Sequence, residues 1–371
     1  MAKRTTKSAV EATPKGITTF VSADWHLDWH TAGVERFTDV TRTLVEELFP
    51  AICKRAEKGP TQFVFVGDLC EDQPGRGATS GGILRAIEFA CGFRARLESH
   101  GVPSFWLTGN HDVAEDGLLK STLSPIAGPL AVDYPGGFGS DFFALPYTSR
   151  DRTYSPGEAV RKAAERGVVP RAVFGHLNVE GITPGSEATD MPRGRDVFWP
   201  IDELRQCWPG VVCIGGHIHR ALQVKSYNPI EIVGAPARFT FGEESNEPGY
   251  LILESDNTVR RVKFKMARRL ITVDAAEVEK LKEGPADQIA RVRCKGSPEK
   301  ARDAEVAAMA HATAVKVVRE DDAPTQVAQP RTEPRKGNRE AVLEVARMVA
   351  SADKNALLEH VSGCLDAEGV A

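Results

Sequence analysis

Short apolar runs that end in a polar residue recur along the first 220 residues of the chain. Each run is rich in β-branched, aromatic or other apolar residues, as a buried strand is, and closes on Asp, Asn or His, usually beside a glycine. In open α/β sheets, ligands bind where the carboxyl ends of the strands meet. The pattern therefore predicts one crevice lined by polar side chains from five strand ends: Thr18 to His26, Gln62 to Asp68, Ser104 to Asp112, Arg171 to His176 and Val211 to Arg220.

Apolar residues between the first three runs recur at helical spacing. Those from Val34 to Leu48 predict a helix that begins at about Val34 and that Pro50 interrupts or ends. Those from Ile83 to Leu97 predict a second helix, which stops near Gly101. Strands that alternate with helices in this way indicate an α/β fold.

The middle of the chain is less regular. Residues 113 to 150 are rich in glycine and proline, with one expected strand at Phe142 to Leu145. Ser155 and Gly167 frame a short helix, as an N-cap and a residue just past the helix end. The long polar stretch from Glu180 to Asp196 predicts a functional or mobile loop over the proposed crevice.

Composition shifts divide the chain into five parts. Residues 1–16 predict a disordered lead-in, and residues 17–268 the main domain. Residues 269–320 predict a small α+β capping domain, in which a helix lies between strands. Residues 321–337 contain three prolines and no aromatic residue, which indicates a flexible linker. Residues 338–371 predict a hairpin of two amphipathic helices, which either docks on the body or binds a partner.

Composition limits the kinds of protein that this chain can be. The chain has 371 residues, of which 42% are hydrophobic and 26% charged, as in ordinary globular proteins of two or three domains. A net charge of −4 gives no global basic field, so nucleic-acid binding would depend on local patches or bound cations. Seven cysteines without a CxxC pair indicate neither a disulfide framework nor a zinc knuckle, and favour a cytoplasmic protein. We expect no signal peptide and no membrane span.

Seven side chains at the strand ends have the character of metal ligands. They combine carboxylate, amide and imidazole groups, which suit Mn²⁺, Fe²⁺ or Zn²⁺ better than Ca²⁺. Seven ligands exceed what one ion uses, but they suffice for two ions about 3.5–4 Å apart if one carboxylate bridges them. We choose Asp68 for the bridge because it stands alone at its strand end. The seven are Asp24, His26, Asp68, Asn110, His176, His217 and His219.

His111 directly follows the candidate ligand Asn110 and is not needed for coordination. Two such ions would activate water for attack on a phosphate, and the departing alkoxide needs a proton. We therefore expect His111 to be the general acid. An eighth ligand or an electrostatic contact to phosphate are its alternative roles. Asp112 is expected to brace the loop.

The motifs D-x-H, G-D, G-N-H-D, G-H and G-H-x-H stand in this order between Asp24 and His219. Each alone is weak, but the set resembles the calcineurin-like metallophosphoesterase superfamily. The resemblance implies a two-sheet α/β sandwich flanked by helices, with the metals at its rim. It also implies a division of the ligands, with Asp68 shared between an ion held by Asp24, His26 and His219 and an ion held by Asn110, His176 and His217.

Within the superfamily, several stretches resemble the SbcD-type family of DNA double-strand-break repair nucleases: SADWHLD, HLNVEGITPGSE, GGHIHR and GAPARFTFGE. The resemblance implies a Mn²⁺-dependent exonuclease and endonuclease that acts on DNA ends in repair and recombination. It implies that the capping domain helps to hold DNA and that residues 338–371 bind an SMC-like ATPase of the SbcC type. Homodimerisation through core helices is expected on the same ground.

The chain departs from that family after Asp68. Relatives often carry His or Asp three residues later, as the partner of the catalytic histidine, whereas this chain has Glu71 followed by Asp72. Either carboxylate could keep His111 protonated. The loop that follows also differs from the usual form, which affects substrate detail more than reaction type.

Basic residues near the last motifs are candidate phosphate or DNA contacts. Arg220 follows the His-x-His pair, while Arg261, Lys263 and Lys265 share one face of an expected strand. A solvated sheet face is the alternative interpretation of those three.

Two other functions remain open. One is a phosphatase or phosphodiesterase for a small phosphomonoester or a cyclic nucleotide. Protein phosphatases of the superfamily follow GD with DRG and use GNHE, and neither motif occurs here. The other is an inactive scaffold of the same fold, which the presence of the full ligand set disfavours.

Overall fold

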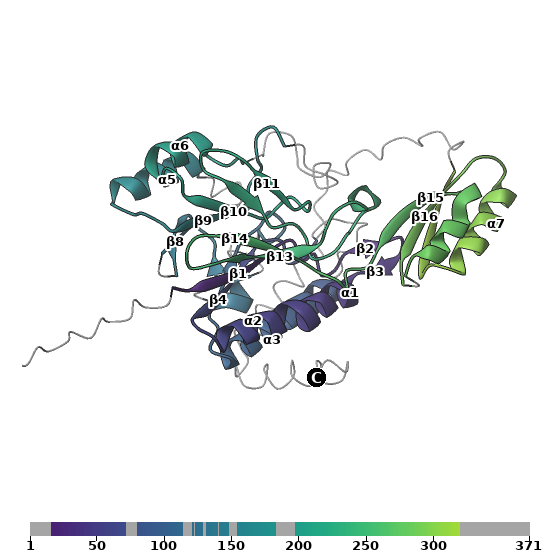
Figure 1. Ribbon diagram of the computed structural model, residues 1–371, viewed down its shortest axis with the longest axis horizontal. Coiled ribbons are helices and arrows are strands. Elements are labelled where there is room, and N and C mark those ends of the chain that lie inside the picture. The colour runs from purple at the N-terminus through teal and green to yellow at the C-terminus, as the bar shows by residue number, and fades with distance from the viewer. Residues whose placement is uncertain are drawn as a thin grey trace, which may run out of the picture.

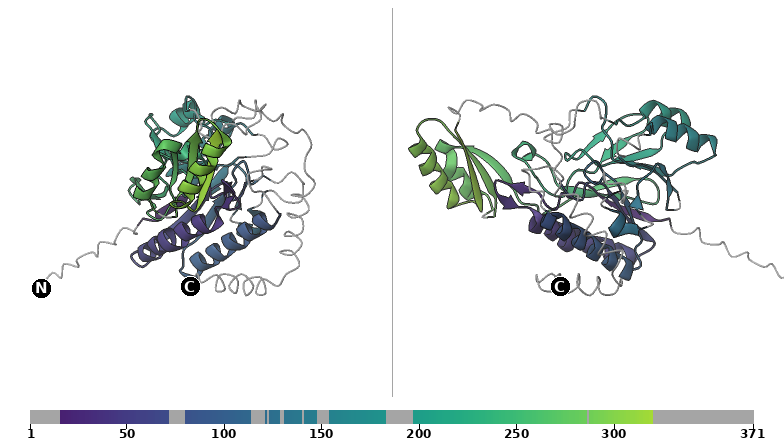
Figure 2. Two further views of the ribbon diagram at one scale, coloured as in Figure 1. Left: turned by 90° about the vertical axis from the view of Figure 1, so that its right-hand side faces the viewer. Right: turned by 180° about the vertical axis from the view of Figure 1, so that it is seen from behind.

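The computed structural model describes residues 16–71, 80–113, 121, 123–128, 131–139, 141–147, 154–182, 197–285 and 287–319. Its main body is a sandwich of two six-stranded sheets whose outer faces are covered by helices (Figure 1). Figure 2 shows the purple and blue helices lying together below the sheets. The fold is thus the mixed α/β arrangement that the sequence predicts.

The first sheet has the strand order β14-β13-β1-β4-β5-β6. Its four strands β1, β4, β5 and β6 are parallel, while β13 and β14 add antiparallel pairs at one side. The parallel part confirms the strand-helix-strand pattern of the sequence. The strands are β1 (Thr18–Ser22), β4 (Thr61–Val66), β5 (Ser104–Leu107), β6 (Ala131–Val132), β13 (Gly249–Leu253) and β14 (Val259–Lys263).

The second sheet has the strand order β11-β12-β10-β9-β8-β7. Here β8, β9, β10 and β12 are parallel, and β7 and β11 are antiparallel edge strands. The strand expected at Phe142 to Leu145 is present as β8. The strands are β7 (Gly136–Phe138), β8 (Phe142–Leu145), β9 (Ala172–Gly175), β10 (Val212–Gly215), β11 (Leu222–Val224) and β12 (Ile230–Ile232).

Three apolar layers hold the sandwich together. The inner layer lies between the sheets and includes Val64, Phe174 and Ile214, all fully buried. One outer layer joins the first sheet to its helices around Trp25, and the other joins the second sheet to its helices around Trp199. Strands buried on both faces need the near-continuous apolar runs that this sequence has.

The first helical segment begins later than predicted, and of the two outcomes predicted at Pro50, interruption or ending, it shows an interruption. Val34 lies in a short strand, β3 (Val34–Glu35), paired with β2 (His30–Thr31), so the expected helix start was wrong. The helix begins at Phe37 and continues past Pro50 as α1 (Phe37–Thr43), a π-helical turn (Leu44–Leu48) and α2 (Phe49–Ala56).

Pro50 does not end this helix because it stands at the first positions of α2. A proline inside an α-helix removes a donor and clashes with the carbonyl four residues earlier. The wide turn before it avoids that clash, since the backbone N–H of Phe49 donates to Leu44 O, five residues earlier.

The other helices agree with the sequence patterns. α3 (Ser80–Ser99) stops just before Gly101, whose φ of +68° suits a residue without a side chain. α5 (Pro156–Glu165) begins at the predicted N-cap, where Ser155 Oγ accepts from the backbone N–H of Glu158. The remaining short helices of the body are α4 (Ser124–Ala127), α6 (Ile201–Cys207) and the 3-10 turn η5 (Phe241–Glu243).

A smaller sheet of three parallel strands follows the sandwich, in the order β15-β16-β17. It lies at the right of Figure 1 with its helix on one face. Its open face contacts the turn η5, where Arg291 stacks over Phe241 and pairs with Glu244 at 3.6 Å. The elements are β15 (Leu270–Asp274), the 3-10 segment η6 (Ala275–Glu283), β16 (Ile289–Cys294), α7 (Pro298–Met309) and β17 (Ala314–Arg319).

Several predictions fall outside the described residues. They are the lead-in as far as residue 15, most of the loop from Glu180 to Asp196, the linker 321–337 and the helical hairpin 338–371. Within the described ranges, no helix is long and apolar enough to cross a membrane.

Candidate metal centre

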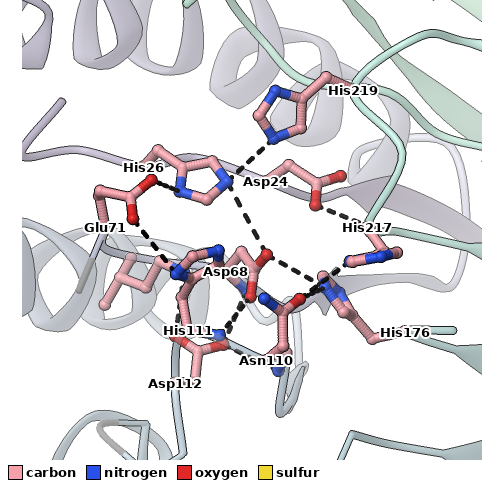
Figure 3. Close-up of polar contacts among 12 residues, drawn as sticks. Asp24, His26, Asp68, Glu71, Asn110, His111, Asp112, His176, His217 and His219 are labelled. Carbon is pink, nitrogen blue, oxygen red and sulfur yellow. Dashed lines mark hydrogen bonds and ion pairs between the residues drawn. The ribbon is translucent and has the colours of Figure 1, made fainter. Parts of the chain in front are cut away.

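The seven predicted ligands converge at one rim of the sandwich (Figure 3). Each follows a strand end, so the two sheets supply ligands from both sides of the rim. Asp24 and His26 follow β1, Asp68 follows β4, Asn110 follows β5, His176 follows β9, and His217 and His219 follow β10.

The backbone at this rim adopts conformations that side chains rarely accept. Four of the seven residues have positive φ: Asp24 at 54°, His26 at 38°, Asp68 at 63° and His217 at 80°. Each such residue costs on the order of 1–3 kcal/mol, which the surrounding structure must offset. Strained backbone of this kind is common at functional sites. Here the positive φ angles direct the side chains into the crevice.

Two groups of ligand atoms form within the rim. The first group joins Asp24, His26 and His219, and the second joins Asp68, His176 and His217. Within each group the ligand atoms lie within 4.8 Å of one another, and all six residues are buried. The division agrees with the one that the family resemblance implies.

Asp68 stands between the two groups. Its Oδ2 atom lies 3.1 Å from His176 Nε2 in the second group and 3.8 Å from His26 Nε2 in the first. Its Oδ1 atom accepts from the backbone N–H of His111 at 2.9 Å, which fixes the carboxylate plane. This is the position that a bridging ligand requires.

Asn110 completes the second group through its side-chain oxygen. Asn110 Oδ1 lies 3.0 Å from His176 Nε2 and 2.9 Å from His217 Nδ1. Ligand atoms around an octahedral ion, at bond lengths near 2.1 Å, are separated by about 3.0 Å. The spacing therefore fits one coordination sphere.

The first group offers ligand atoms that can turn lone pairs toward one cation. His219 Nδ1 faces the carboxylate of Glu243 at 3.3 Å, so Nε2 of the neutral ring carries a lone pair. That Nε2 lies 3.1 Å from His26 Nε2. Nearby, the buried Oδ2 of Asp24 has no hydrogen-bond partner among the described residues. A divalent ion would satisfy all three atoms at once.

The second group offers such ligand atoms too. His176 Nδ1 faces Val66 O at 2.8 Å, and His217 Nε2 faces Asn178 Oδ1 at 3.1 Å. When both rings are neutral and these nitrogens donate to the two oxygens, the other nitrogen of each ring is left as an acceptor. Those acceptors point at Asn110 Oδ1, another acceptor. A cation again resolves the arrangement.

Protonation of the metal-free centre shows the same demand for positive charge. Burial opposes charge on His176, but the carboxylates of Asp68 and Asp24 outweigh it and raise the pKa of the imidazole to about 9. Burial also raises the pKa of Asp24 to about 7, although His176 and His219 act against the rise. Protons thus occupy positions that metal ions would take.

The remaining imidazoles stay neutral. Burial, reinforced by the charge of His176, lowers the pKa of His217 to about 3. Burial also holds the pKa of His26 well below its usual value. Neutral imidazole is the form that binds metals.

His111 lies beside the centre with its ring partly open to solvent, the side chain being 14% exposed. Its Nδ1 lies 3.4 Å from the carboxylate of Glu71, which is buried. The backbone N–H of Glu71 donates to Asp28 Oδ1 at 2.5 Å, so the main chain that carries this side chain is held in place. Of the two candidate partners, Glu71 contacts His111, whereas Asp72 lies outside the described residues.

Asp112 braces the loop, as the sequence predicts. Its buried carboxylate accepts from three backbone N–H groups, those of Asp68 at 2.7 Å, Leu69 at 3.0 Å and Gly109 at 2.9 Å. These bonds join the end of β4 to the end of β5. Burial and the charge of Asp68 raise the pKa of Asp112 to about 6, against the effect of the three donors.

Two side chains behind the ligands were missed by sequence reasoning. Asn178 contacts His217, and Glu243 contacts His219. Asn178 stands two residues after His176, so extended backbone could have indicated that it faces the same way. Glu243 belongs to the quoted stretch GAPARFTFGE, but no spacing rule connects it with His219.

The basic residues proposed to contact phosphate lie in two places. Arg220 is exposed next to His219, but Arg261 donates to the backbone oxygens of Ile232 and Val233. Lys263 pairs with Glu247 at 2.5 Å on the edge strand β14. The backbone N–H of Lys265 donates to Glu47, so the three lie along the sheet edge.

Known proteins that resemble this chain include one family and two crystal structures. No curated protein matches the chain. A crystal structure of a 5′-nucleotidase from Candida albicans SC5314 is 12% identical, covers 68% of this chain and 52% of its own, and has a TM-score of 0.39. Another crystal structure is 15% identical, covers 67% of this chain and 99% of its own, and has a TM-score of 0.40. Residues 17–221 match the calcineurin-like phosphoesterase family, and the chain therefore belongs to that family, whose members are typically metal-dependent hydrolases.

Proposed function

We propose that this chain is a metal-dependent DNA nuclease that hydrolyses phosphodiester bonds at DNA ends. In this proposal it is the exonuclease and endonuclease subunit of a complex with an SMC-like ATPase, in DNA repair and recombination. The observation that carries the hydrolytic part is the position of His111 beside Asp68, with Glu71 behind it.

The centre has the parts that phosphodiester hydrolysis requires. Two divalent ions held there would polarise the phosphate and lower the pKa of the attacking water. We propose Mn²⁺, which suits the mixture of carboxylate, amide and imidazole ligands. The strained turns after β1, β4 and β10 carry ligands that would hold these ions.

His111 would supply the proton that the departing oxygen needs. Glu71 faces its Nδ1 and stabilises the charged imidazolium, which leaves the other ring nitrogen to donate. The partial exposure of the ring allows a substrate to reach it. The alkoxide released from a phosphate ester is a poor leaving group unless it is protonated. The pair of His111 and Glu71 therefore favours an ester substrate.

The choice of DNA rests on the sequence resemblance to SbcD-type nucleases and on the small β15-β16-β17 unit after the core. In the proposal this unit helps to hold DNA, and residues 338–371 bind the ATPase. Pull-down of an SbcC-type ATPase with the full chain, compared with a chain ending at residue 337, tests the second part. Retained binding after the truncation would exclude the tail as the binding element.

Cleavage of linear duplex DNA in Mn²⁺ tests the nuclease activity. We expect the full chain to degrade DNA from its ends and the His111→Ala protein to lose at least a hundredfold in rate, the usual contribution of a general acid. His100→Ala is a matched control, because His100 lies before β5 and therefore at the opposite edge of the sheet from the centre.

A small chromogenic phosphodiester assayed in parallel separates the alternatives. Rapid turnover of the small ester with intact DNA would replace the nuclease with a small-molecule phosphoesterase. Failure to hydrolyse either substrate, by protein that binds Mn²⁺, would favour the inactive scaffold.

A further inference from the structure

Each metal-ligand histidine has a second ring nitrogen that faces away from the ligand group. The oxygen atoms nearest to these outer nitrogens differ in charge between the two groups. In the first group the atoms belong to carboxylates. Glu243 Oε1 lies 3.3 Å from His219 Nδ1, within hydrogen-bond reach. Glu71 Oε2 is the nearest carboxylate oxygen to His26 Nδ1 at 4.0 Å, too far for a hydrogen bond, and this nitrogen has no hydrogen-bond partner among the described residues. Both carboxylates are buried, with side chains 3% and 1% exposed.

In the second group the atoms behind the histidines are neutral. The backbone oxygen of Val66 lies 2.8 Å from His176 Nδ1. The amide oxygen of Asn178 lies 3.1 Å from His217 Nε2, and Asn178 is buried. Both oxygens accept a hydrogen bond, but neither carries a charge.

Hydrogen bonds to neighbouring residues hold Glu243 and Asn178, which belong to none of the ligand motifs. Glu243 Oε2 accepts from the backbone N–H of Phe239 at 2.8 Å, and its Oε1 from the hydroxyl of Thr240 at 3.1 Å. The backbone of Asn178 forms an isolated β-bridge with Phe198: its N–H donates to Val197 O at 2.8 Å, and its oxygen accepts from the N–H of Trp199 at 2.9 Å. Their contacts to the histidines are therefore built into the fold.

Such outer contacts select the tautomer of a metal-binding histidine and raise its basicity, and a carboxylate does so more than a neutral oxygen. Glu243 leaves Nε2 of His219 for the ion, whereas Asn178 leaves Nδ1 of His217. The formal charges add to the difference. The first group contains the carboxylate of Asp24 and has the carboxylate of Glu243 behind His219, while the second relies on neutral Asn110 and the shared Asp68.

We infer that Glu243 and Asn178 are positioning residues that make the two metal sites unequal. The ion held by Asp24, His26 and His219 binds first and tightly. The ion held by Asn110, His176 and His217 binds second and exchanges readily. This inference rests on the metal centre and not on the identity of the substrate, so a metal titration without DNA tests it separately from the nuclease proposal.

The test is a titration of the metal-free full chain with Mn²⁺, followed by calorimetry and by electron paramagnetic resonance. We expect two binding steps with dissociation constants at least tenfold apart, and only the signal of isolated Mn²⁺ up to one equivalent. Asn110→Ala should remove the weaker step, and His219→Ala the tighter one. A spin-coupled signal below one equivalent, or two steps of equal affinity, would overturn the inference.

Two substitutions test the positioning residues in opposite directions. Glu243→Gln should weaken the tighter step 10–100-fold, the usual effect of losing an outer partner, and change the weaker step much less. Asn178→Asp places a carboxylate behind His217 and should strengthen the weaker step. Glu247→Gln is the matched control, because Glu247 is an exposed glutamate of the same segment whose ion pair is with Lys263 and not with a histidine.

A purely structural role for Glu243 predicts a different result. Both steps would then weaken together, and thermal unfolding of the metal-free protein would shift by the same amount in Glu243→Gln. If that variant does not fold, Asn178→Asp still decides, since an unchanged or weaker second step there contradicts the inference.

Discussion

Asp112 offers the sharpest test of how the centre is built. Its carboxylate accepts three backbone N–H groups at the ends of β4 and β5, and it touches no predicted ligand side chain through these bonds. Oδ2 accepts two of the groups and Oδ1 accepts the third. Substitution here should loosen the loops that carry Asp68 and Asn110 without removing a ligand.

The size of the effect follows from the number of donors left without a partner. A buried donor without a partner costs about 1–3 kcal/mol. Asp112→Ala leaves three such donors, so we expect a loss of about 3–5 kcal/mol of unfolding free energy after some relaxation. Asp112→Asn can keep the two bonds at Oδ2 but turns an NH₂ toward the N–H of Leu69, which predicts a loss of about 1–3 kcal/mol.

Denaturant unfolding of the metal-free proteins at pH 8 measures both losses, because the pKa of Asp112 is about 6 and the carboxylate is then ionised. Mn²⁺ titration of the same proteins should show weaker binding in the order wild type, Asn, Ala. Equal losses in the two variants, or losses below about 1 kcal/mol in both, would refute the bracing role.

Three further predictions concern single features of the fold. Gly109→Ala should weaken Mn²⁺ binding at least tenfold, because the new Cβ would lie 2.2 Å from Asp68 Oδ1. Gly137→Ala is the control and should bind Mn²⁺ normally, because its Cβ would lie 3.7 Å from the nearest atom, Phe142 O. Mn²⁺ binding at pH 7 should release roughly one to two protons, because His176 and Asp24 are protonated below pKa values of about 9 and 7. Calorimetry in buffers of different ionisation enthalpy measures this number, which should fall as the pH rises through 9. Proton release that does not depend on pH would contradict the prediction. Ser155→Ala should cost about 1 kcal/mol in urea unfolding through loss of the α5 N-cap, and an unchanged midpoint would contradict that role.

Most of the sandwich could be predicted because its strands and helices follow simple periodicities. Strands such as β4 and β9 are buried on both faces, so their sequences are continuous apolar runs. The seven ligands follow those runs directly, which is why sequence order alone could bring them together. Helix boundaries were harder. The π-helical turn before Pro50 depends on how the chain packs around that proline, which local spacing does not record.

The outer contacts of the centre could not be predicted from the sequence. Glu243 lies 24 positions from His219, and the turn η5 brings it behind the ring. The pairing of Glu71 with His111 depends on the register between β4 and β5 and on the bond from its N–H to Asp28. Such contacts are set by tertiary structure, and only the side-chain types are visible in the sequence.

We propose that this rim holds two divalent ions in two distinct groups of ligands. Crystals grown with Mn²⁺ and measured near the manganese absorption edge test it most directly. We predict two anomalous peaks about 3.5–4 Å apart, one among Asp24, His26 and His219 and one among Asn110, His176 and His217, with Asp68 touching both. A single peak, or peaks away from these side chains at saturating Mn²⁺, would contradict the account.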